Sequence, residues 1–268
     1  MRHVLFWELK RRRTALLWWT IGSIVMTVVI LALYPSIRDQ AAQMNQVINQ
    51  LPEGLREMKA GSAGSVDVGD PLEFLNSQLF YATLPIMWII LAITRGGSIL
   101  GREEQDKTLE VLLAQPITRS RLVTAKALAL ACESFIVGGA TLIVILALSP
   151  VFDLHISSIR LIAATAYTSL FCLSFGYIAY CLQAASSLTR KGAVALATVL
   201  GFGGYILTSL SGLTDWLDMP VKAFPYHYFK PLDALQGHVP KGLLLYLCLA
   251  FIFGTLIAIV GFRKRDID

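Results

Sequence analysis

The sequence predicts an all-α membrane protein with six transmembrane helices, and two observations carry that prediction. First, 55% of the residues are hydrophobic and only 15% are charged, whereas soluble domains carry roughly 25% charged residues. Second, charged residues are absent from six long runs, at residues 14–37, 74–94, 134–152, 161–189, 192–214 and 242–262. A bilayer core about 30 Å thick needs about 20 apolar residues of helix, and each run is about that long. Buried helices of a soluble core are shorter and keep a polar face, so that alternative is disfavoured.

The basic residues predict that both termini are cytoplasmic. If the N-terminus is inside and six spans alternate, most Lys and Arg residues fall on the cytoplasmic side, which is the bias seen in membrane proteins. The exceptions are Arg38, Arg56, Lys59, Arg160, Lys222, Lys230 and Lys241. The same bias accounts for the pI near 9.1, so nucleic-acid binding is not needed to explain the basic charge.

The first apolar run, 14–37, follows the basic residues 10–13 and could be mistaken for a signal peptide. Its apolar length exceeds the usual core of such a peptide, and no small-x-small cleavage site follows it. We interpret it as a retained transmembrane anchor.

The external segment 36–73 is predicted to contain an amphipathic helix. Its apolar residues recur at spacings of three and four, which describes one helix face: Ile37, Ala41, Met44, Ile48, Leu51, Leu55 and Met58. Pro52 and Gly54 are expected to break this helix into two short ones. We expect the helix to lie on the membrane interface, and the alternative is that it covers an exit path.

Segment 102–126, between the second and third spans, is cytoplasmic and helical in pattern. Pro116 is expected to end one helix there, and Thr118 is expected to cap the next one, which runs into the third span. The first helix has an apolar face of Thr108, Leu109, Leu112 and Leu113, and a polar face of Glu103, Glu104, Lys107 and Glu110. No lipid covers leucine side chains in the cytosol, so we expect a partner protein with a groove to do so.

Two charged residues lie at or inside the predicted spans, where a charge costs roughly 2.5–3.5 kcal/mol. Glu133 either contributes to a translocation path or a proton-coupled site, or pairs with Lys126 or a neighbouring helix near the inner headgroups. We favour the pairing. Arg95, near the inner end of the second span, is expected to reach the interface by snorkelling.

Aromatic residues and glycines in the spans have common structural explanations. The external segment 215–241 carries aromatic residues that are expected to form an interfacial belt, with substrate stacking as the alternative: Trp216, Phe224, Tyr226, Tyr228 and Phe229. The glycines that would let helices approach closely, and that are compatible with a homodimer, are Gly97, Gly101, Gly201, Gly203 and Gly204.

Catalytic and cofactor motifs were not found. The phosphate-cradling GxxxxGK[ST] loop is absent, so the chain is not expected to hydrolyse ATP, and neither GxSxG nor HExxH occurs. Glu103 and Glu104 resemble the paired glutamates of intramembrane CAAX-type proteases, but Thr108 stands where that pattern needs an arginine. No metal-type spacing of Cys or His is present, and no disulfide framework is implied by the four cysteines.

Residues 102–119 resemble the ABC-2 family of transporter permeases. The matching residues are Glu103, Glu104, Thr108, Leu109, Glu110, Leu112, Leu113, Pro116, Ile117, Thr118 and Arg119. Lys107 departs from the family, which commonly has glycine there. The resemblance extends over nearly the whole chain, through the basic entry 8–13, the segments 51–53 and 74–76, and the closing residues 262–267.

The resemblance implies one ABC-2 type transmembrane domain over residues 1–268, in the plasma (inner) membrane of a bacterium or archaeon. It implies that segment 102–126 holds a coupling helix that docks on a cytosolic ATPase, and that two permease copies bind two ATPases carrying ATP and Mg. The expected docking residues are Glu103, Glu104, Thr108, Leu109, Glu110, Leu112, Leu113, Pro116 and Arg119, with Glu133 as a possible part of the translocation path.

Members of the ABC-2 family that this chain resembles include permeases linked to bacitracin-type antibiotic resistance, to peptide or bacteriocin self-protection and to sodium export. The mostly apolar spans lack paired intramembrane carboxylates, which favours an amphipathic peptide, antibiotic or lipid-like substrate over a cation. The open alternatives are an intramembrane hydrolase or transferase, and a regulatory membrane protein of the same fold that moves nothing.

Overall fold

The structure, a computed structural model, describes residues 2–51, 67–105, 118–185, 188–211, 215–238 and 241–264. Within these ranges it contains helices and no strands. Six helical stretches are long and apolar enough to cross a membrane, so the predicted all-α fold with six spans is confirmed. Their bounds are Arg13–Asp39, Pro71–Gly96, Arg119–Leu148, Ser158–Ala185, Arg190–Thr208 and Lys241–Arg263.

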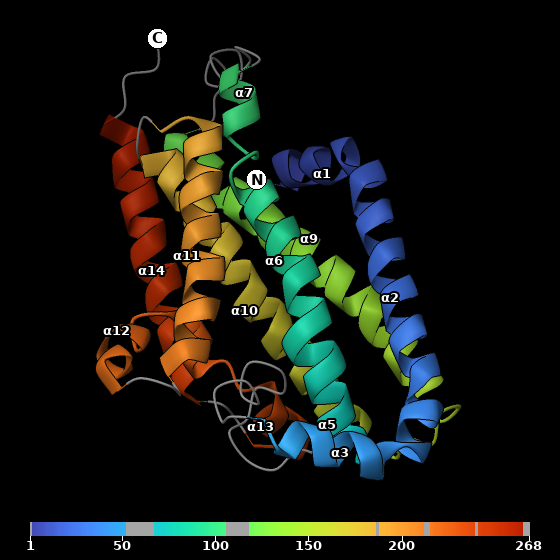
Figure 1. The fold of residues 1–268 in the computed structure, drawn as a ribbon. Helices are drawn as coiled ribbons and strands as arrows, with labels where there is room; N and C mark the ends of the chain where they lie inside the picture. The colour runs from blue at the N-terminus through green and yellow to red at the C-terminus, as the bar shows by residue number, and fades with distance from the viewer. Residues whose placement is uncertain are drawn as a thin grey trace.

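The spans are joined by short helices at both ends of the bundle. The spanning helices are α2 (Arg13–Asp39), α5 with η1 and α6 (Pro71–Phe74, Leu75–Thr83 and Leu84–Gly96), α9 (Arg119–Leu148), α10 (Ser158–Ala185), α11 (Arg190–Ser211) and α14 (Lys241–Lys264). One end carries α1 (Arg2–Arg11), α7 (Gly101–Gln105) and the last turn of α14, as Figure 1 shows. The other end carries α3 (Ala41–Asn49), η3 (Pro225–Tyr228) and α13 (Pro231–Gln236), while η2 (Asp215–Leu217) and α12 (Asp218–Val221) follow α11.

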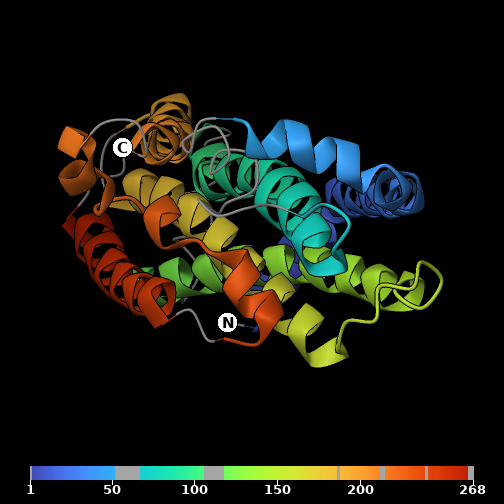
Figure 2. The same ribbon diagram turned by 60° about the horizontal axis from the view of Figure 1, so that its bottom comes forward.

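Helix α10 is the centre of the bundle. In Figure 2 it lies in the middle, in yellow, with α6 (teal), α9 (green) and α14 (red) around it. In its most apolar stretch 72% of the residues are buried, against 22% for α2 and 17% for α14. The outer faces of α2, α11 and α14 instead expose large apolar side chains such as Leu17, Val199 and Phe253. This distribution suits a bundle whose surroundings are lipid, because lipid covers apolar side chains as well as a protein core does.

Glycine lets α6 and α10 touch through their backbones. A Cβ atom added at Gly96 would overlap the carbonyl oxygen of Gly176, and one at Gly176 would lie 2.5 Å from the carbonyl oxygen of Ala92. Real Cβ atoms essentially never come within 3.0 Å of such atoms. The two helices therefore cross at a distance that only glycine permits.

Most of the glycines predicted to allow close approach face other parts of the same chain. A Cβ at Gly97 would overlap Val194, and one at Gly101 would lie 2.9 Å from the Cβ of Arg190, so both face the start of α11. Gly204 faces Phe224, whereas a Cβ at Gly203 would meet nothing within 4 Å.

The second span changes helix type before Pro85. Residues Leu75–Thr83 form a π-helical segment, and α6 begins at Leu84. The side-chain hydroxyl of Thr83 donates to the carbonyl oxygen of Gln78 at 2.7 Å. Pro85 stands in the first turn of α6, where a helix tolerates a missing backbone N–H.

The predicted external amphipathic helix is present in part. α3 buries Ile48 against Val68, with Ile37, Ala41 and Met44 packed beside them. Asn45 holds the chain that leads to the second span, because its side chain donates to Asp67 at 2.7 Å and accepts from the backbone N–H of Val68 at 2.9 Å. The predicted break at Pro52 and Gly54 lies outside the described residues.

The prediction of an interfacial aromatic belt between α11 and α14 is wrong for Phe229 and Tyr226, which are buried in the bundle. Phe229 is 2% exposed and stacks on Phe171 of α10, with ring centroids 3.8 Å apart. Tyr226 is also buried and packs edge-on against Phe171. Sequence reasoning missed this arrangement because nothing local shows that the segment folds back into the bundle. Trp216, by contrast, is exposed.

Tyr167 fastens this returning segment to α10. Its hydroxyl donates to the carbonyl oxygen of Tyr228 at 2.7 Å and accepts from the backbone N–H of Lys230 at 3.1 Å. We expect Tyr167→Phe to lower the free energy of unfolding by about 1–3 kcal/mol, because two backbone groups lose their partner in a part-buried place. Thermal unfolding of the purified protein measures this effect. A variant as stable as the wild type would contradict the fastening role.

Candidate functional site

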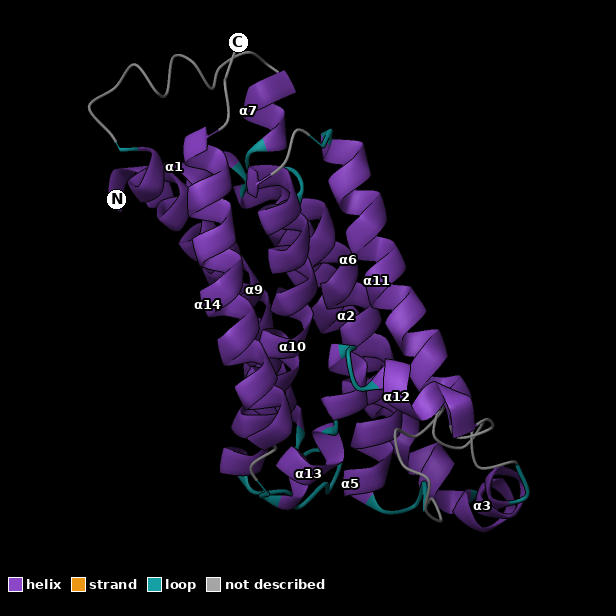
Figure 3. Cartoon of the chain, turned by 90° about the vertical axis from the view of Figure 1, so that its left-hand side faces the viewer, coloured by secondary structure: helices purple, strands orange, loops and turns teal. Residues whose placement is uncertain are grey.

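The candidate site is at the end of the bundle that carries α1 and α7. Residues 106–117 lie outside the described part of the chain, and the residues on either side of them, in α7 and at the start of α9, are at this end. In Figure 3 α7 projects beyond the ends of the spanning helices and α1 lies near it. Among the predicted docking residues, the structure describes the side chains of Glu103 and Arg119. The side chain of Glu104 lies outside the described part, as do Thr108, Leu109, Glu110, Leu112, Leu113 and Pro116.

Lys126 joins three helices through buried ion pairs. It is 0% exposed, although it is a lysine in the first half of α9. Its Nζ lies 2.5 Å from Oε1 of Glu103 in α7, and it also pairs with Oε1 of Glu8 in α1. Glu8 and Glu103 are 4% and 3% exposed. We call Glu8, Lys126 and Glu103 the lysine junction.

Burial decides the electrostatics of the lysine junction. A charge taken out of water loses several kcal/mol of solvation, and only close opposite charges offset that loss. Burial raises the pKa of the Glu103 carboxyl above its usual value, because desolvation outweighs the opposing attraction to Lys126. The lysine, with a carboxylate on each side, is therefore the member whose loss leaves most charge uncompensated.

A second buried pair lies two turns further along α9. Nε and Nη2 of Arg95, in α6, donate to the two carboxylate oxygens of Glu133. Arg95 is 6% exposed and Glu133 is 1% exposed, so the expectation that Arg95 snorkels to the interface is wrong. Glu133 pairs with a neighbouring helix, and Lys126 pairs elsewhere. Residues seven apart lie on nearly the same face of a helix, so α9 presents both charges to the bundle.

Both flanks of segment 106–117 are held by contacts within the chain. On one side Glu103 binds α7 to Lys126. On the other side, the Thr118 hydroxyl accepts from the backbone N–H of Arg121 at 3.4 Å, so the predicted cap of the next helix is confirmed. Nη1 of Arg119 donates to the carbonyl oxygen of Phe262 at 3.2 Å, in the last turns of α14.

The sequence offered Glu133 as one partner of Lys126 and pointed to neither Glu8 nor Glu103. Glu8 is the one acidic residue of α1, which otherwise carries basic residues. A lone carboxylate in a basic helix, together with a lysine inside an apolar span, is the signal that could have suggested the pair. Their 118-residue separation hides the contact from any local pattern.

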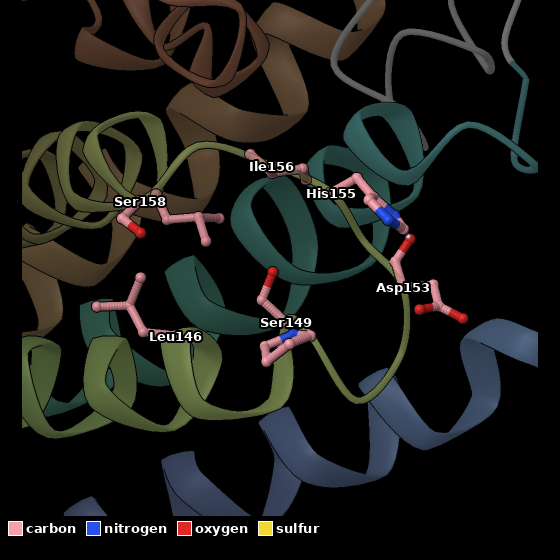
Figure 4. A pocket seen from close by; sticks show the side chains of 8 residues that line it. Leu146, Ser149, Asp153, His155, Ile156 and Ser158 are labelled. Carbon is pink, nitrogen blue, oxygen red and sulfur yellow. Dashed lines mark hydrogen bonds between the residues drawn. The ribbon is translucent and has the colours of Figure 1, made fainter.

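A separate pocket opens at the opposite end, between the end of α9 and the start of α10 (Figure 4). Its volume is about 420 Å³, and its lining includes Ser149, His155, Ile156 and Ser158. Nδ1 of His155 lies 2.7 Å from the carbonyl oxygen of Asp153. Asp153 and His155 have φ angles of 51° and 49°. This left-handed conformation is uncommon for residues other than glycine and occurs here in the sharp loop between α9 and α10. Within the described ranges no three His, Cys, Asp or Glu side chains gather into a metal site.

The fold and the site together define a polytopic membrane protein in which a short helix outside the spans is tied to the bundle by buried charges. A model of the family described as "ABC-2 family transporter protein" matches residues 3–236. The chain therefore belongs to the ABC-2 family. Members of this family are the transmembrane components of ABC transporters and not the ATPase subunits. Neither a curated protein nor a solved structure matches the chain.

Proposed function

We propose that this chain is the permease of an ATP-driven exporter and couples, through segment 102–126, to a separate ATPase subunit that binds ATP and Mg. The observation that carries the proposal is the anchoring of both flanks of segment 106–117, by Glu103 and Lys126 on one side and by Thr118 and Arg119 on the other. A segment that receives force from a partner must transmit it to the spans through stiff contacts. The end that carries α1 and α7 then faces the cytoplasm of a bacterium or archaeon.

In this proposal, a movement of α7 caused by the ATPase reaches the spanning helices through the contacts at the site. A movement of α7 acts on Lys126, and through it on α1 and α9. Glu133 passes the movement of α9 to Arg95 in α6, and Arg119 passes it to the end of α14. Since α6 touches α10 backbone to backbone at Gly96, the central helix is reached in one further step.

An amphipathic or hydrophobic substrate, such as a peptide, an antibiotic or a lipid-like molecule, fits the charge distribution best. In the described part of the chain, the buried carboxylates Glu8, Glu103 and Glu133 all face cations of the protein. Ionisable residues inside a membrane often mark the path of an ion, and these three carboxylates are engaged with cations of the protein. Two copies of the permease with two ATPases complete the proposed exporter. A role for Glu133 in the path itself remains a prediction.

Leu112→Asp is the test of the docking role. We expect the variant to insert into the membrane normally but to lose association with the ATPase, because a carboxylate replaces an apolar side chain that a groove would cover. An affinity pull-down of the tagged protein from gently solubilised native membranes, with identification of the co-eluting chains, measures this. Val151→Asp makes a comparable change at an exposed residue of the opposite end and should keep the ATPase.

Other outcomes would point elsewhere. Recovery of the ATPase with Leu112→Asp would count against docking through this segment. If no ATPase accompanies even the wild-type protein, the exporter proposal fails, and product formation by the isolated chain would then support an intramembrane hydrolase or transferase. An ATPase whose turnover responds to no transported molecule would support a regulatory protein.

A further inference from the structure

The corner between α1 and α2 exposes apolar side chains beside the spans. Helix α1 crosses the end of the bundle, whereas α2 runs along it (Figure 1). Phe6 and Trp7 of α1 are exposed, at 69% and 48%. Leu17 and Trp18, in the second turn of α2, are exposed as well. The apolar surface of α1 therefore lies beside the apolar surface that α2 presents outside the bundle.

Cations border this apolar surface. Lys10 and Arg11 end α1, Arg13 begins α2, and all three side chains are exposed. The guanidinium of Arg11 lies 5.0 Å from the ring centroid of Trp7, so charge and aromatic ring share one place. Lys10 and Arg13 make no ion pair with another described residue. The corner thus carries positive charge beside its exposed tryptophans, at the edge of the apolar surface.

The opposite face of α1 fixes this orientation. Glu8 is buried against Lys126, and Leu9 packs against the hydrophobic core. Rotating α1 so that its cations turned inward would break the Glu8–Lys126 pair and expose Leu9. The outward placement of Lys10 and Arg11 is therefore determined by buried contacts and does not depend on the freedom of surface side chains.

We propose that this corner, formed by residues 6–18, is a binding surface for the headgroups of anionic phospholipids. Tryptophan rings settle at the boundary between hydrocarbon and headgroups, where Lys and Arg meet anionic phosphates. The corner presents both residue types together, next to a helix that spans the bilayer. A helix that lies in the interface binds through its apolar face and its basic residues together.

A lipid surface explains the corner better than a protein partner does. A protein groove would cover Phe6 and Trp7 but would have to stop where Leu17 and Trp18 enter the level of the spans. Lipid covers both helices without a break. Its phosphates supply negatively charged partners for Lys10 and Arg13, which form no ion pair with another described residue. The argument holds whichever side of the membrane this end faces, and it does not depend on the proposed exporter function.

The test measures the thermal stability of the isolated permease in nanodiscs of phosphatidylcholine with increasing phosphatidylglycerol. A lipid that binds the folded state raises the melting temperature by mass action. We expect the wild type to be stabilised, and we expect Lys10→Gln with Arg13→Gln to need about thirtyfold more phosphatidylglycerol for half of that stabilisation. The matched control, Lys222→Gln with Lys241→Gln, removes two exposed charges elsewhere and should respond as the wild type does.

Three results would overturn the proposal. Wild-type protein that gains no stability from phosphatidylglycerol has no such surface. An equal response of the corner variant and the wild type would place the lipid elsewhere on the protein. If inorganic phosphate in phosphatidylcholine nanodiscs reproduces the stabilisation, the corner binds the phosphate group in solution and not the lipid. Because the ATPase is absent from this experiment, its outcome is separate from that of the exporter test.

Discussion

Lys126→Met is expected to lower the free energy of unfolding by about 3–5 kcal/mol, because it leaves Glu8 and Glu103 buried without their shared cation. Methionine has nearly the size of lysine, so the loss comes from charge and not from a cavity. Thermal or denaturant unfolding of the purified permease measures it. We expect association with the ATPase to weaken as well, since α7 loses its anchor.

The charge explanation has two controls. Lys191→Met makes the same substitution at an exposed lysine of α11 and should change stability little. Adding Glu8→Gln and Glu103→Gln to Lys126→Met removes the charges together and should recover most of the stability. If this triple variant is as unstable as the single one, the lysine stabilises the fold by packing and not by neutralising the two carboxylates.

Gly96→Ala is expected to destabilise the bundle by about 3 kcal/mol, the upper end of the usual cost of overpacking. The added methyl group meets the carbonyl oxygen of Gly176, and backbone cannot move aside as a flexible side chain can. The two central spans must therefore separate. Melting temperature and the yield of monodisperse protein after solubilisation report the effect.

Gly139→Ala is the matched comparison. It is also a glycine inside a spanning helix, but its new methyl group would meet nothing within 4 Å. Alanine is the better helix former, so we expect this variant to be unchanged or slightly more stable. Equal destabilisation by both substitutions would show that the close contact between α6 and α10 does not account for the effect at Gly96.

Hydropathy predicted the six spans because the length of an apolar helix is a local property. Runs 14–37 and 242–262 differ from α2 and α14 by a few residues. The third span differs most: its charge-free run begins after Glu133, whereas α9 begins at Arg119. A charge marks the end of a span only when it faces lipid or water, and Lys126 and Glu133 instead face charges of opposite sign.

The site was predictable to the extent that it depends on neighbours in the chain. The cap at Thr118 follows from residue type and position, and the structure confirms it. The pairing of Lys126 with Glu8, the approach of Gly96 to Gly176 and the stacking of Phe229 on Phe171 join distant residues. Such contacts depend on which helices become neighbours, and no periodicity in one sequence contains that information.

The order of the paired charges along the chain bears on how the protein is made. Glu8, Arg95 and Glu103 all precede Lys126 and Glu133, so a ribosome releases the partners of α9 before α9 itself. Inserting α9 alone would place two charges in the bilayer, at roughly 2.5–3.5 kcal/mol each. When α9 arrives, however, every partner of those charges is already at the membrane. The first three spans can therefore neutralise their buried charges before the central helix α10 has been synthesised.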